Sequence, residues 1–460
     1  MIGTMKEIRG TLGLSPHHGD GDISIAGVST DTRTIGPGDL FVALKGESFD
    51  GHDFVKAAFD HGAVAAVVEN DYLSSEVMEG KLLRVGSSLK AYGLIARMYR
   101  RKCAFKVVAI TGSSGKTTTK DMVAEVLSER FRVVKTQKNY NNEVGLPLTI
   151  LSAPEETEVL VLEMGMRAKG EIAYLAGIAE PDMGIITNIG VAHIGELGSQ
   201  ENILKAKGEL LEGLKMDGIG IFSGEDGFEK ELEKLCRGSI LKVGFGDNCD
   251  IRGWITEEQE GMTSVHLSVN GKEEMIHLPY QGRHLIQDSL LAIACGSLMG
   301  ISVKKAEEAL NHLMISPGRL SVKDWKSVRL IDDTYNANPE SMKASIDVLS
   351  GYSGRKIAVL GDMRELGPME KRFHLEIGPY LFSKKIDILI TVGFLGSLIG
   401  EGFKVAGGDL RQVYSCTDTK EAADVLKKLL ERGDTVLFKA SRAMGLEDVI
   451  ERIEGITDEV

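Results

Sequence analysis

The sequence predicts an α/β protein of three domains. A small N-terminal α/β domain precedes a central domain with a parallel sheet and an antiparallel flank, and a Rossmann-like domain ends the chain. Continuous apolar runs alternate with helical patterns along most of the 460 residues, which is typical of parallel sheets covered by helices. Residues 250–279 instead alternate polar and apolar positions, as antiparallel strands do. A chain of this length also exceeds one ordinary hydrophobic core.

Residues 1–103 form the first predicted domain. Strand-like runs at Leu40 to Leu44, Ala63 to Glu69 and Leu82 to Val85 alternate with turn-rich segments. The basic stretch from Arg97 to Lys106 then leads into a new apolar strand. We therefore place the first domain boundary after residue 103.

Residues 104–316 form the second predicted domain. Val159 to Leu162 and Gly184 to Thr187 are continuous apolar runs, as expected of buried parallel strands. The helix predicted from Lys116 to Phe131 carries apolar residues at helical spacing. Asn270-Gly271 is the kind of pair that makes a tight turn, so we expect a hairpin in the antiparallel flank.

Residues 317–460 form the third predicted domain, because Ser316-Pro317-Gly318 breaks the preceding pattern. Apolar runs alternate with helical stretches beyond this break, which indicates an open, doubly wound sheet. The expected strands are Val328 to Ile331, Lys356 to Leu360, Ile386 to Val392 and Thr435 to Phe438.

Composition excludes several classes of function. The formal charge of -13 argues against a nucleic-acid or membrane-surface role, for which a basic face is expected. The N-terminus has no apolar signal segment, and no apolar run approaches the ~18 residues that span a bilayer. The five cysteines form no C-x-x-C pair, so we expect reduced thiols. We expect a cytoplasmic monomer with no nucleic-acid or membrane partner.

The strongest local signal is a glycine-rich segment between a strand and a helix. Val107 to Ile110 is followed by Thr111-Gly112-Ser113-Ser114-Gly115-Lys116-Thr117-Thr118. Backbone N–H groups and a helix N-terminus at such a junction bind phosphate oxygens. We expect Lys116 to reach the outer phosphates and the Thr117 hydroxyl to ligate Mg²⁺. The first glycine of the general pattern is replaced by Ile110, and the loop indicates ATP or GTP without indicating the reaction.

This loop resembles the phosphate loop of the Mur ligases and of their folylpolyglutamate synthetase relatives. The similarity covers essentially the whole chain. In the central domain it continues in Asn141 to Pro147, Glu163 to Gly165, Thr187 to His193 and Lys205 to Glu209. In the outer domains, the segments that resemble the member adding D-alanyl-D-alanine are Ser29 to Arg33, Lys45 to His52, Asp332 to Pro339 and Gly361 to Gly367.

The resemblance implies a central P-loop ATPase domain and a reaction of peptidoglycan precursor synthesis. ATP would phosphorylate the C-terminal carboxylate of UDP-N-acetylmuramoyl-tripeptide, and D-alanyl-D-alanine would attack the acyl phosphate. The products would be UDP-N-acetylmuramoyl-pentapeptide, ADP and phosphate. The implied cofactors are ATP and two Mg²⁺ ions. The sequence does not distinguish lysine from diaminopimelate at the third peptide position.

Lys116, Glu163, His193 and Lys207 are the catalytic residues that the resemblance implies. Glu163 and His193 each follow a predicted parallel strand, where the active sites of doubly wound sheets collect. With Thr117 they would ligate magnesium, although histidine is an unusual ligand for that ion. The alternative for His193 is that it only caps the following turn.

The lysine that follows Ala206 becomes a carbamate in relatives by reacting with CO₂, so Lys207 would also support the metal. The alternative is a solvated helix lysine, and Lys205 is close enough to confuse the assignment. Alignment on Ala206-Lys207 favours Lys207.

Nucleotide contacts are expected from the central and third domains. Arg319 follows the interdomain break, where a hinge could bring its guanidinium to the phosphates. Asp333 would accept a hydrogen bond from a ribose hydroxyl, and the alternative for Asp332 and Asp333 is loop capping. The expected nucleotide-binding residues are Thr111, Gly112, Ser113, Ser114, Gly115, Lys116, Thr117, Thr118, Asn142, His284, Asp288, Arg319, Asp333, Tyr335 and Asn336.

One segment departs from the family pattern Gly-x-His-Asn-x-x-Asn. Here it is Gly282-Arg283-His284-Leu285-Ile286-Gln287-Asp288, so Leu285 and Asp288 stand where asparagines are usual. We expect an altered contact in this part of the adenine site.

Substrate contacts are implied at both ends of the chain. Arg33 and Lys45 suit the UDP pyrophosphate, because both are cations. The dipeptide carboxylate also needs a cation. The candidates for the UDP-linked substrate are Ser29, Asp31, Arg33, Lys45 and His52, and those for the dipeptide are Asn338, Lys439, Ser441 and Arg442.

Three other functions compete with this hypothesis. Another ligase of the superfamily is disfavoured by the segment Asp333 to Pro339. A GTPase would ordinarily carry an Asn-Lys-x-Asp guanine reader, which we do not find in the expected place. A nucleotide-gated binding protein without catalysis would not need Lys116, Glu163, His193 and Lys207 together.

Overall fold

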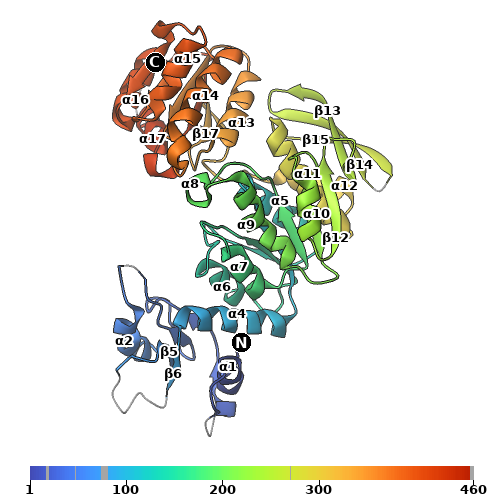
Figure 1. Ribbon diagram of the computed structural model, residues 1–460, viewed down its shortest axis with the longest axis vertical. Coiled ribbons are helices and arrows are strands. Elements are labelled where there is room, and N and C mark those ends of the chain that lie inside the picture. Colours follow the sequence, from blue (N-terminus) through green and yellow to red (C-terminus); the bar gives the residue numbers. More distant parts are fainter. Residues whose placement is uncertain (17–19, 47, 74–80, 270, 456–460) are drawn as a thin grey trace.

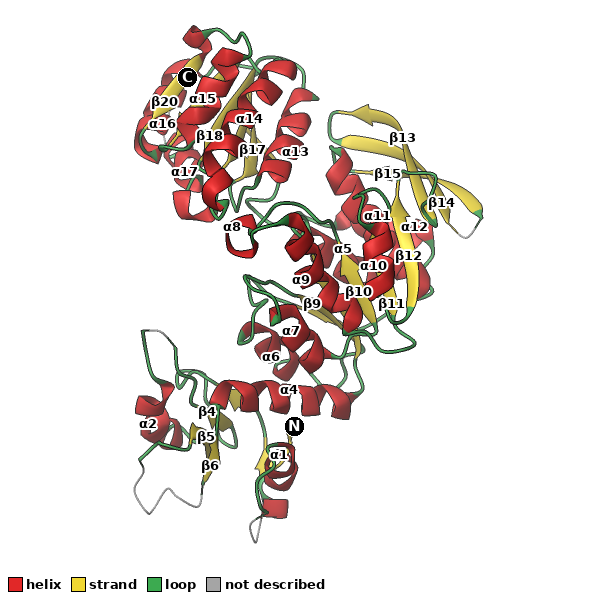
Figure 2. Ribbon diagram, in the orientation of Figure 1, coloured by secondary structure: helices red, strands yellow, loops and turns green. Residues whose placement is uncertain are grey.

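The computed structural model describes residues 1–16, 20–46, 48–73, 81–269 and 271–455. Three α/β lobes follow one another in chain order along the longest axis (Figure 1). Figure 2 shows that each lobe has strands at its centre and helices outside them. The predicted three-domain α/β architecture is therefore confirmed. Within the described ranges, no helix is both long and apolar enough to cross a bilayer.

The N-terminal lobe is built on a small parallel sheet with the strand order β3-β4-β5-β6. The three predicted strands are present, each within the predicted run. Two further strands of two residues each, β1 and β2, pair with each other in antiparallel orientation and precede this sheet in the sequence. The elements are β1 (Gly3–Thr4), α1 (Met5–Thr11), β2 (Ser24–Ile25), β3 (Val28–Ser29), β4 (Leu40–Val42), α2 (Val55–Asp60), β5 (Ala65–Glu69) and β6 (Leu82–Val85).

Helix α4 (Ser88–Cys103) joins the first lobe to the second (Figure 1). Most of the basic stretch at the predicted domain boundary therefore belongs to the last turns of this helix. Arg100 donates to the carbonyl oxygen of Ala179 at 2.9 Å, and Tyr99 donates to that of Ala153 at 2.8 Å. Since the apolar residues of α4 share a core with the central lobe, this helix anchors the N-terminal lobe to it.

The central sheet has the order β15-β14-β13-β12-β11-β10-β7-β9-β8 in the described residues. The strands from β8 to β13 run parallel, and β13, β14 and β15 form an antiparallel meander. The predicted hairpin is confirmed as β14 and β15, in which Val269 pairs with Lys272, and β13 adds a third antiparallel strand that was not predicted. Gly271 lies between β14 and β15, whereas Asn270 lies outside the described residues. The strands are β7 (Lys106–Thr111), β8 (Val133–Lys135), β9 (Val159–Glu163), β10 (Met183–Ile186), β11 (Ile219–Ser223), β12 (Ser239–Gly244), β13 (Ile251–Gln259), β14 (Met262–Val269) and β15 (Lys272–Leu278).

Helices of the central lobe cover both faces of this sheet (Figure 2). The helix predicted to reach Phe131 ends at Ser128, because the chain turns there to enter β8. Arg130 lies in this turn, and its guanidinium donates hydrogen bonds to the carbonyl oxygens of Met299 and Gly300. The helices are α5 (Lys116–Ser128), α6 (Gly145–Leu151), α7 (Glu171–Ala179), α8 (Ile194–Leu197), α9 (Gln200–Glu212), α10 (Glu229–Leu235), α11 (Arg283–Leu298) and α12 (Val303–His312).

The C-terminal sheet has the order β16-β17-β21-β18-β19-β20, with β16 antiparallel at one edge. Sequence patterns missed β16 and β20, because both are edge strands with polar or partly exposed residues. The elements are β16 (Ser321–Trp325), β17 (Val328–Asp333), α13 (Pro339–Ser350), β18 (Lys356–Gly361), α14 (Glu370–Ser383), β19 (Ile388–Val392), α15 (Gly396–Val405), β20 (Val413–Cys416), α16 (Thr419–Leu429), β21 (Thr435–Lys439) and α17 (Glu447–Glu454).

The C-terminal lobe touches the central lobe in two places. At the antiparallel flank, Glu260 pairs with Arg329 at 2.9 Å and accepts a hydrogen bond from the Ser353 amide at 3.0 Å. Near α8, the Val191 amide donates to Glu340 at 3.0 Å. A cavity lies between the two lobes.

Helices α14 and α15 approach each other at Gly378. A Cβ atom on this glycine would lie 2.1 Å from the Phe403 nitrogen and 2.5 Å from the Ile399 oxygen. We expect Gly378→Ala to lower the free energy of unfolding by about 2 kcal/mol or more, because backbone cannot give way cheaply. Urea denaturation measures this change. The control is Gly177→Ala in α7, where nothing lies within 4 Å of the added Cβ. Equal stability of Gly378→Ala and the wild type would contradict this packing.

Candidate functional site

The candidate site is a cavity of about 1040 Å³ between the central and C-terminal lobes. It is lined from both sides by the carboxyl ends of parallel strands and the loops that follow them. The predicted residues that line it are Ser113, Ser114, Gly115, Lys116, Thr117, Thr118, Asn142, Glu163, His193, Lys207, His284, Asp288, Arg319, Asp333, Tyr335, Asn336, Asn338 and Lys439.

The predicted phosphate loop joins β7 to α5 on one side of this cavity. Gly112 is required because a Cβ atom there would lie 1.8 Å from the Thr187 hydroxyl oxygen. Gly115 has a φ of 76°, which favours glycine. The first N–H groups of α5 have no partner within the helix, so they can bind phosphate oxygens. Thr111 ends β7, and its hydroxyl donates to the Met164 carbonyl oxygen at 2.9 Å.

Asn188 holds the phosphate loop from behind. Its Oδ1 accepts hydrogen bonds from the amides of Ser113 at 3.1 Å and Ser114 at 3.0 Å. The Ser113 hydroxyl in turn accepts from the Gly190 amide at 2.9 Å. Asn188 was not among the predicted site residues, although it lies in the segment after β10 that resembles the family. These bonds fix the loop and leave the start of α5 for a ligand.

Glu163 was predicted to follow the strand directly, and in the structure it is the last residue of β9. It is 3% exposed, and its two carboxylate oxygens accept from the Thr117 hydroxyl at 2.7 Å and from Asn141 at 2.8 Å. Asn142, which was predicted to contact the nucleotide, accepts a hydrogen bond from the Gly145 amide at 2.9 Å, at the start of α6. A buried carboxylate beside a hydroxyl and a phosphate loop is a donor set that fits magnesium, whose other ligands are commonly phosphates and water.

Two lysine ammonium groups meet at one carbonyl oxygen. Lys116 and Lys207 each place Nζ 2.8 Å from the oxygen of Gly112. Burial, followed by the charge of Lys116, holds the pKa of Lys207 well below its usual value. Burial also lowers the pKa of Lys116. Lys205 is exposed on the same helix, so it is Lys207 that reaches the phosphate loop.

His193 lies seven residues beyond the end of β10, farther along the chain than predicted. It occupies the N-cap position of α8 with a φ of 65°, but its side chain makes no cap hydrogen bond, contrary to the capping alternative. Nδ1 lies 2.9 Å from a carboxylate oxygen of Glu365, in a contact without hydrogen-bond geometry. In the described part of the chain, no three His, Cys, Asp or Glu side chains group closely enough to hold a metal. A metal beside His193 would therefore need ligands of other kinds, such as a carbamate on Lys207 or oxygen atoms of the substrates.

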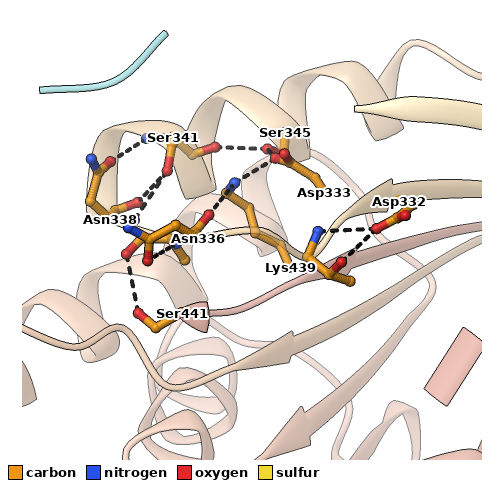
Figure 3. Close-up of polar contacts among 10 residues, drawn as sticks. Asp332, Asp333, Asn336, Asn338, Ser341, Ser345, Lys439 and Ser441 are labelled. Carbon is orange, nitrogen blue, oxygen red and sulfur yellow. Dashed lines mark hydrogen bonds and ion pairs between the residues drawn. The ribbon is translucent and has the colours of Figure 1, made fainter. Parts of the chain in front are cut away.

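Asp333 and Lys439 form a buried ion pair at the opposite wall of the cavity (Figure 3). Lys439 donates to Asp333 Oδ2 at 2.5 Å and to the Asn336 carbonyl oxygen at 3.0 Å. Ser345 donates to the same Asp333 oxygen. Lys439 is 2% exposed and its charge is largely neutralised by Asp333, so it has little charge left for a substrate carboxylate.

Asp332 points away from this pair and caps the neighbouring loop (Figure 3). Its carboxylate accepts from the Gly318 amide at 3.1 Å and from the Thr334 hydroxyl at 2.7 Å. Of the two aspartates for which loop capping was the alternative to nucleotide binding, Asp332 is therefore the one that caps a loop. The Arg319 guanidinium lies 4.0 Å from the centre of the Tyr335 ring, which positions this cation at the cavity.

Three of the four dipeptide candidates, Asn338, Lys439 and Ser441, gather around the loop at residues 336–338 (Figure 3), whereas Arg442 does not. Asn338 caps α13 and approaches the Ser113 carbonyl oxygen at 3.5 Å. Ser441 and Arg442 do not line the cavity. Ser441 accepts from the Arg364 amide at 2.8 Å, whereas the exposed Arg442 pairs with Glu447.

The candidates for the UDP-linked substrate lie in the N-terminal lobe, away from the cavity. Arg33 pairs with Asp31 at 2.5 Å, and the buried Ser29 accepts from the Asp31 amide at 3.0 Å. His52 accepts from the Glu69 amide through Nε2 at 2.9 Å, and its Nδ1 lies 2.6 Å from Asp50. Lys45 lies 3.8 Å from the same aspartate.

In the segment that departs from the family pattern, residues 282–288, burial shifts the pKa values of both Asp288 and His284. Burial raises the pKa of Asp288 to about 8, and a Cβ on Gly115 would lie 2.8 Å from its carboxyl oxygen. Burial lowers the pKa of His284 to about 4, so this imidazole is neutral at pH 7. Leu285 is 5% exposed and belongs to the hydrophobic core.

Fold and site together define an enzyme that binds a nucleoside triphosphate at a phosphate loop and covers it with a second α/β lobe. Three sequence models of one family match successive parts of the chain. They are the Mur ligase family catalytic domain at residues 24–94, the Mur ligase middle domain at 110–296, and the Mur ligase glutamate ligase domain at 318–442. The chain belongs to the Mur ligase family.

Relatives match over nearly the full length. A UDP-N-acetylmuramoyl-tripeptide–D-alanyl-D-alanine ligase from Bacillus subtilis (strain 168) is 40% identical over 430 residues, covering 93% of this chain and 92% of the relative. A crystal structure of MurF from Acinetobacter baumannii has a TM-score of 0.89 and 29% identity, covering 99% of both chains. MurF from Thermotoga maritima in complex with ADP has a TM-score of 0.84 and 32% identity, covering 94% of this chain and 97% of the other.

Asp288→Asn should stabilise the protein in a pH-dependent way. The free carboxyl ionises near pH ~3.9, whereas the pKa in the folded protein is about 8. The wild type therefore loses stability as the pH rises from about 4 to about 8, and the amide variant does not. We expect a gain in unfolding free energy of about 1–3 kcal/mol at pH ~8, measured by chemical denaturation, and none at pH ~4. The matched control is Asp247→Asn, whose side chain is 89% exposed. A gain that does not change with pH would contradict the assignment.

Proposed function

We propose that this chain is an ATP-dependent ligase that joins D-alanyl-D-alanine to UDP-N-acetylmuramoyl-tripeptide through an acyl phosphate. The observation that carries the proposal is the single cavity shared by the phosphate loop, Glu163, Lys207 and the C-terminal lobe. The full-length similarity to relatives with this activity supports the same reaction. The ADP complex of a relative supports ATP as the nucleotide. A cytoplasmic site of action fits a nucleotide-linked substrate.

The first step is transfer of the γ-phosphoryl group to the tripeptide carboxylate. Charge accumulates on the phosphoryl oxygens as the bond to ADP breaks, so cations and fixed N–H groups lower the barrier. Lys116 and the start of α5 supply these on one side. Arg319, held against Tyr335, supplies a planar cation from the C-terminal lobe.

The second step is attack of the dipeptide amine on the acyl phosphate, with phosphate as the leaving group. The amine must lose a proton, and water must be kept away from the acyl phosphate. Glu340 and Glu365, both from the C-terminal lobe, contact the loop that holds the phosphate loop. These contacts couple the C-terminal lobe to the loop, so closure of that lobe would both order the loop and screen the intermediate from water.

Magnesium would be held by Thr117 and Glu163, with His193 and a carbamylated Lys207 at a second position. Bound metal would neutralise charge on the phosphate oxygens. Lys207 suits carbamylation because its depressed pKa favours the neutral amine. The Nζ lone pair would bond to the carbon of CO₂, and a proton would leave to solvent. The product would be an anion beside the Lys116 ammonium, so the two groups would attract each other.

Labelling with ¹³C-bicarbonate tests the carbamate directly. We expect a carbamate NMR signal in the wild type and in Lys205→Ala, and none in Lys207→Ala. Ligation by Lys207→Ala should fall about 100-fold or more, because a charged group near the phosphoryl oxygens is lost. A wild-type protein without the signal, or Lys207→Ala with it, would contradict carbamylation at this residue.

The reaction itself is tested with Mg-ATP, D-alanyl-D-alanine and UDP-muramoyl-tripeptides of the lysine and diaminopimelate types. Phosphate release and product mass are followed together. We expect phosphate only when all three substrates are present, together with the mass of the pentapeptide. Phosphate release that does not need the dipeptide would indicate another acceptor. No turnover with either tripeptide would reject the ligase proposal in favour of nucleotide-gated binding.

A further inference from the structure

Most cations around the cavity already have partners within the protein. Arg283 pairs with Glu225, and Lys439 pairs with Asp333. Lys343 lies over the ring of Tyr380. The carboxylate partners of Arg283 and Lys439 partly neutralise these two charges, so both cations offer less to an anionic ligand.

Arg167 is different. It lines the cavity and is exposed. In the part of the chain that the structure describes, it is the one lysine or arginine of the cavity wall whose side chain makes no hydrogen bond, ion pair or aromatic contact. The pKa of Glu365 is lowered first by His193, and the charge of Arg167 adds to this effect, which places Arg167 near the catalytic end of the cavity.

The loop that carries Arg167 is fixed by its own hydrogen bonds. The Arg167 amide donates to Glu171 at 2.7 Å. Glu209, which is 5% exposed, accepts from the amides of Gly170 at 2.8 Å and Ala173 at 3.0 Å. The backbone is therefore held in place while the guanidinium stays free. The loop backbone is therefore fixed before a ligand binds, so that only the side chain of Arg167 has to lose conformational freedom on binding.

This loop lies on the side of the site that faces the N-terminal lobe. It begins at the end of β9, where Glu163 stands, and leads into α7. Helix α7 packs against α4, and Tyr174 donates to the Leu89 carbonyl oxygen at 3.4 Å. Arg167 follows Glu163 by four residues, which limits their Cα separation to about 14 Å. A peptide that runs from the N-terminal lobe to the phosphate loop would pass this position.

We propose that Arg167 binds a free carboxylate of the muramoyl peptide, distinct from the carboxylate that is activated, and so helps to determine peptide specificity. This inference rests on the proposed function. A guanidinium suits a carboxylate because two parallel N–H···O bonds can form. This carboxylate can belong to the side chain of the third residue, because diaminopimelate has a side-chain carboxylate and lysine lacks one. It can also belong to an earlier residue of the peptide.

The test is binding of UDP-muramoyl-tripeptides to the full chain by calorimetry, together with steady-state kinetics. We expect Arg167→Gln to raise the Kd for the peptide about tenfold or more, because a charge-assisted hydrogen bond is lost. Arg167→Lys should recover part of this loss. The KM values for ATP and D-alanyl-D-alanine should stay the same. The matched control is Lys169→Gln, which removes a charge from the same exposed loop outside the cavity wall.

The two tripeptide types distinguish the source of the carboxylate. If it is on the third residue, the wild type binds the diaminopimelate peptide more tightly than the lysine peptide, and Arg167→Gln abolishes that preference. If it is earlier in the chain, the variant weakens both peptides equally.

Two outcomes would overturn the inference. One is unchanged binding of both peptides by Arg167→Gln, and the other is a rise in KM for ATP alone, which would assign this cation to the nucleotide. In both cases the wild type still ligates, so the proposed function would stand. A wild type that neither binds nor converts any tripeptide would instead reject the proposed function itself.

Discussion

The carbonyl oxygen of Gly112 accepts hydrogen bonds from the buried Lys207 and the partly buried Lys116, and the electrostatics of the site depend on this contact. Lys116 and Lys207 come from different helices, yet each Nζ lies 2.8 Å from that oxygen. Two ammonium groups at one neutral acceptor repel each other strongly in a buried environment. The arrangement is favourable only if one lysine is neutral or if anions are close by. Both conditions fit a site for phosphoryl transfer.

Interdomain contacts converge on the same loop. Asn338 approaches the Ser113 carbonyl oxygen, Glu340 accepts from the Val191 amide, and Glu365 pairs with His193. Ser113 and the segment after β10 also bond to each other. The orientation of the C-terminal lobe is therefore coupled to the phosphate loop through short contacts. A shift of that lobe would change the loop that holds the phosphates, which is a physical route by which closure and catalysis can be linked.

Local patterns predicted much of the fold and the nucleotide side of the site. Buried parallel strands appear as continuous apolar runs, and the phosphate loop has its own spacing, so β7, β9 and α5 could be found. The pairing of His193 with Glu365, and that of Asp333 with Lys439, could not, because each depends on how distant segments pack. The role of α4 in joining two lobes could not be predicted either, because Arg100 bonds to carbonyl and carboxylate groups at residues 179–182, which are distant in the sequence.

The charge distribution explains how an acidic protein can select anionic substrates. The chain carries a formal charge of -13, so its surface as a whole repels anions. Within the cavity, Arg319 is held against an aromatic ring, and Arg167 extends from a fixed loop. Neither has a carboxylate partner among the described residues. The cavity is therefore a local site of attraction for phosphate and carboxylate on an acidic protein. An anion gains from these cations only when it is positioned between the lobes, and this requirement ties binding to the geometry in which the reaction can occur.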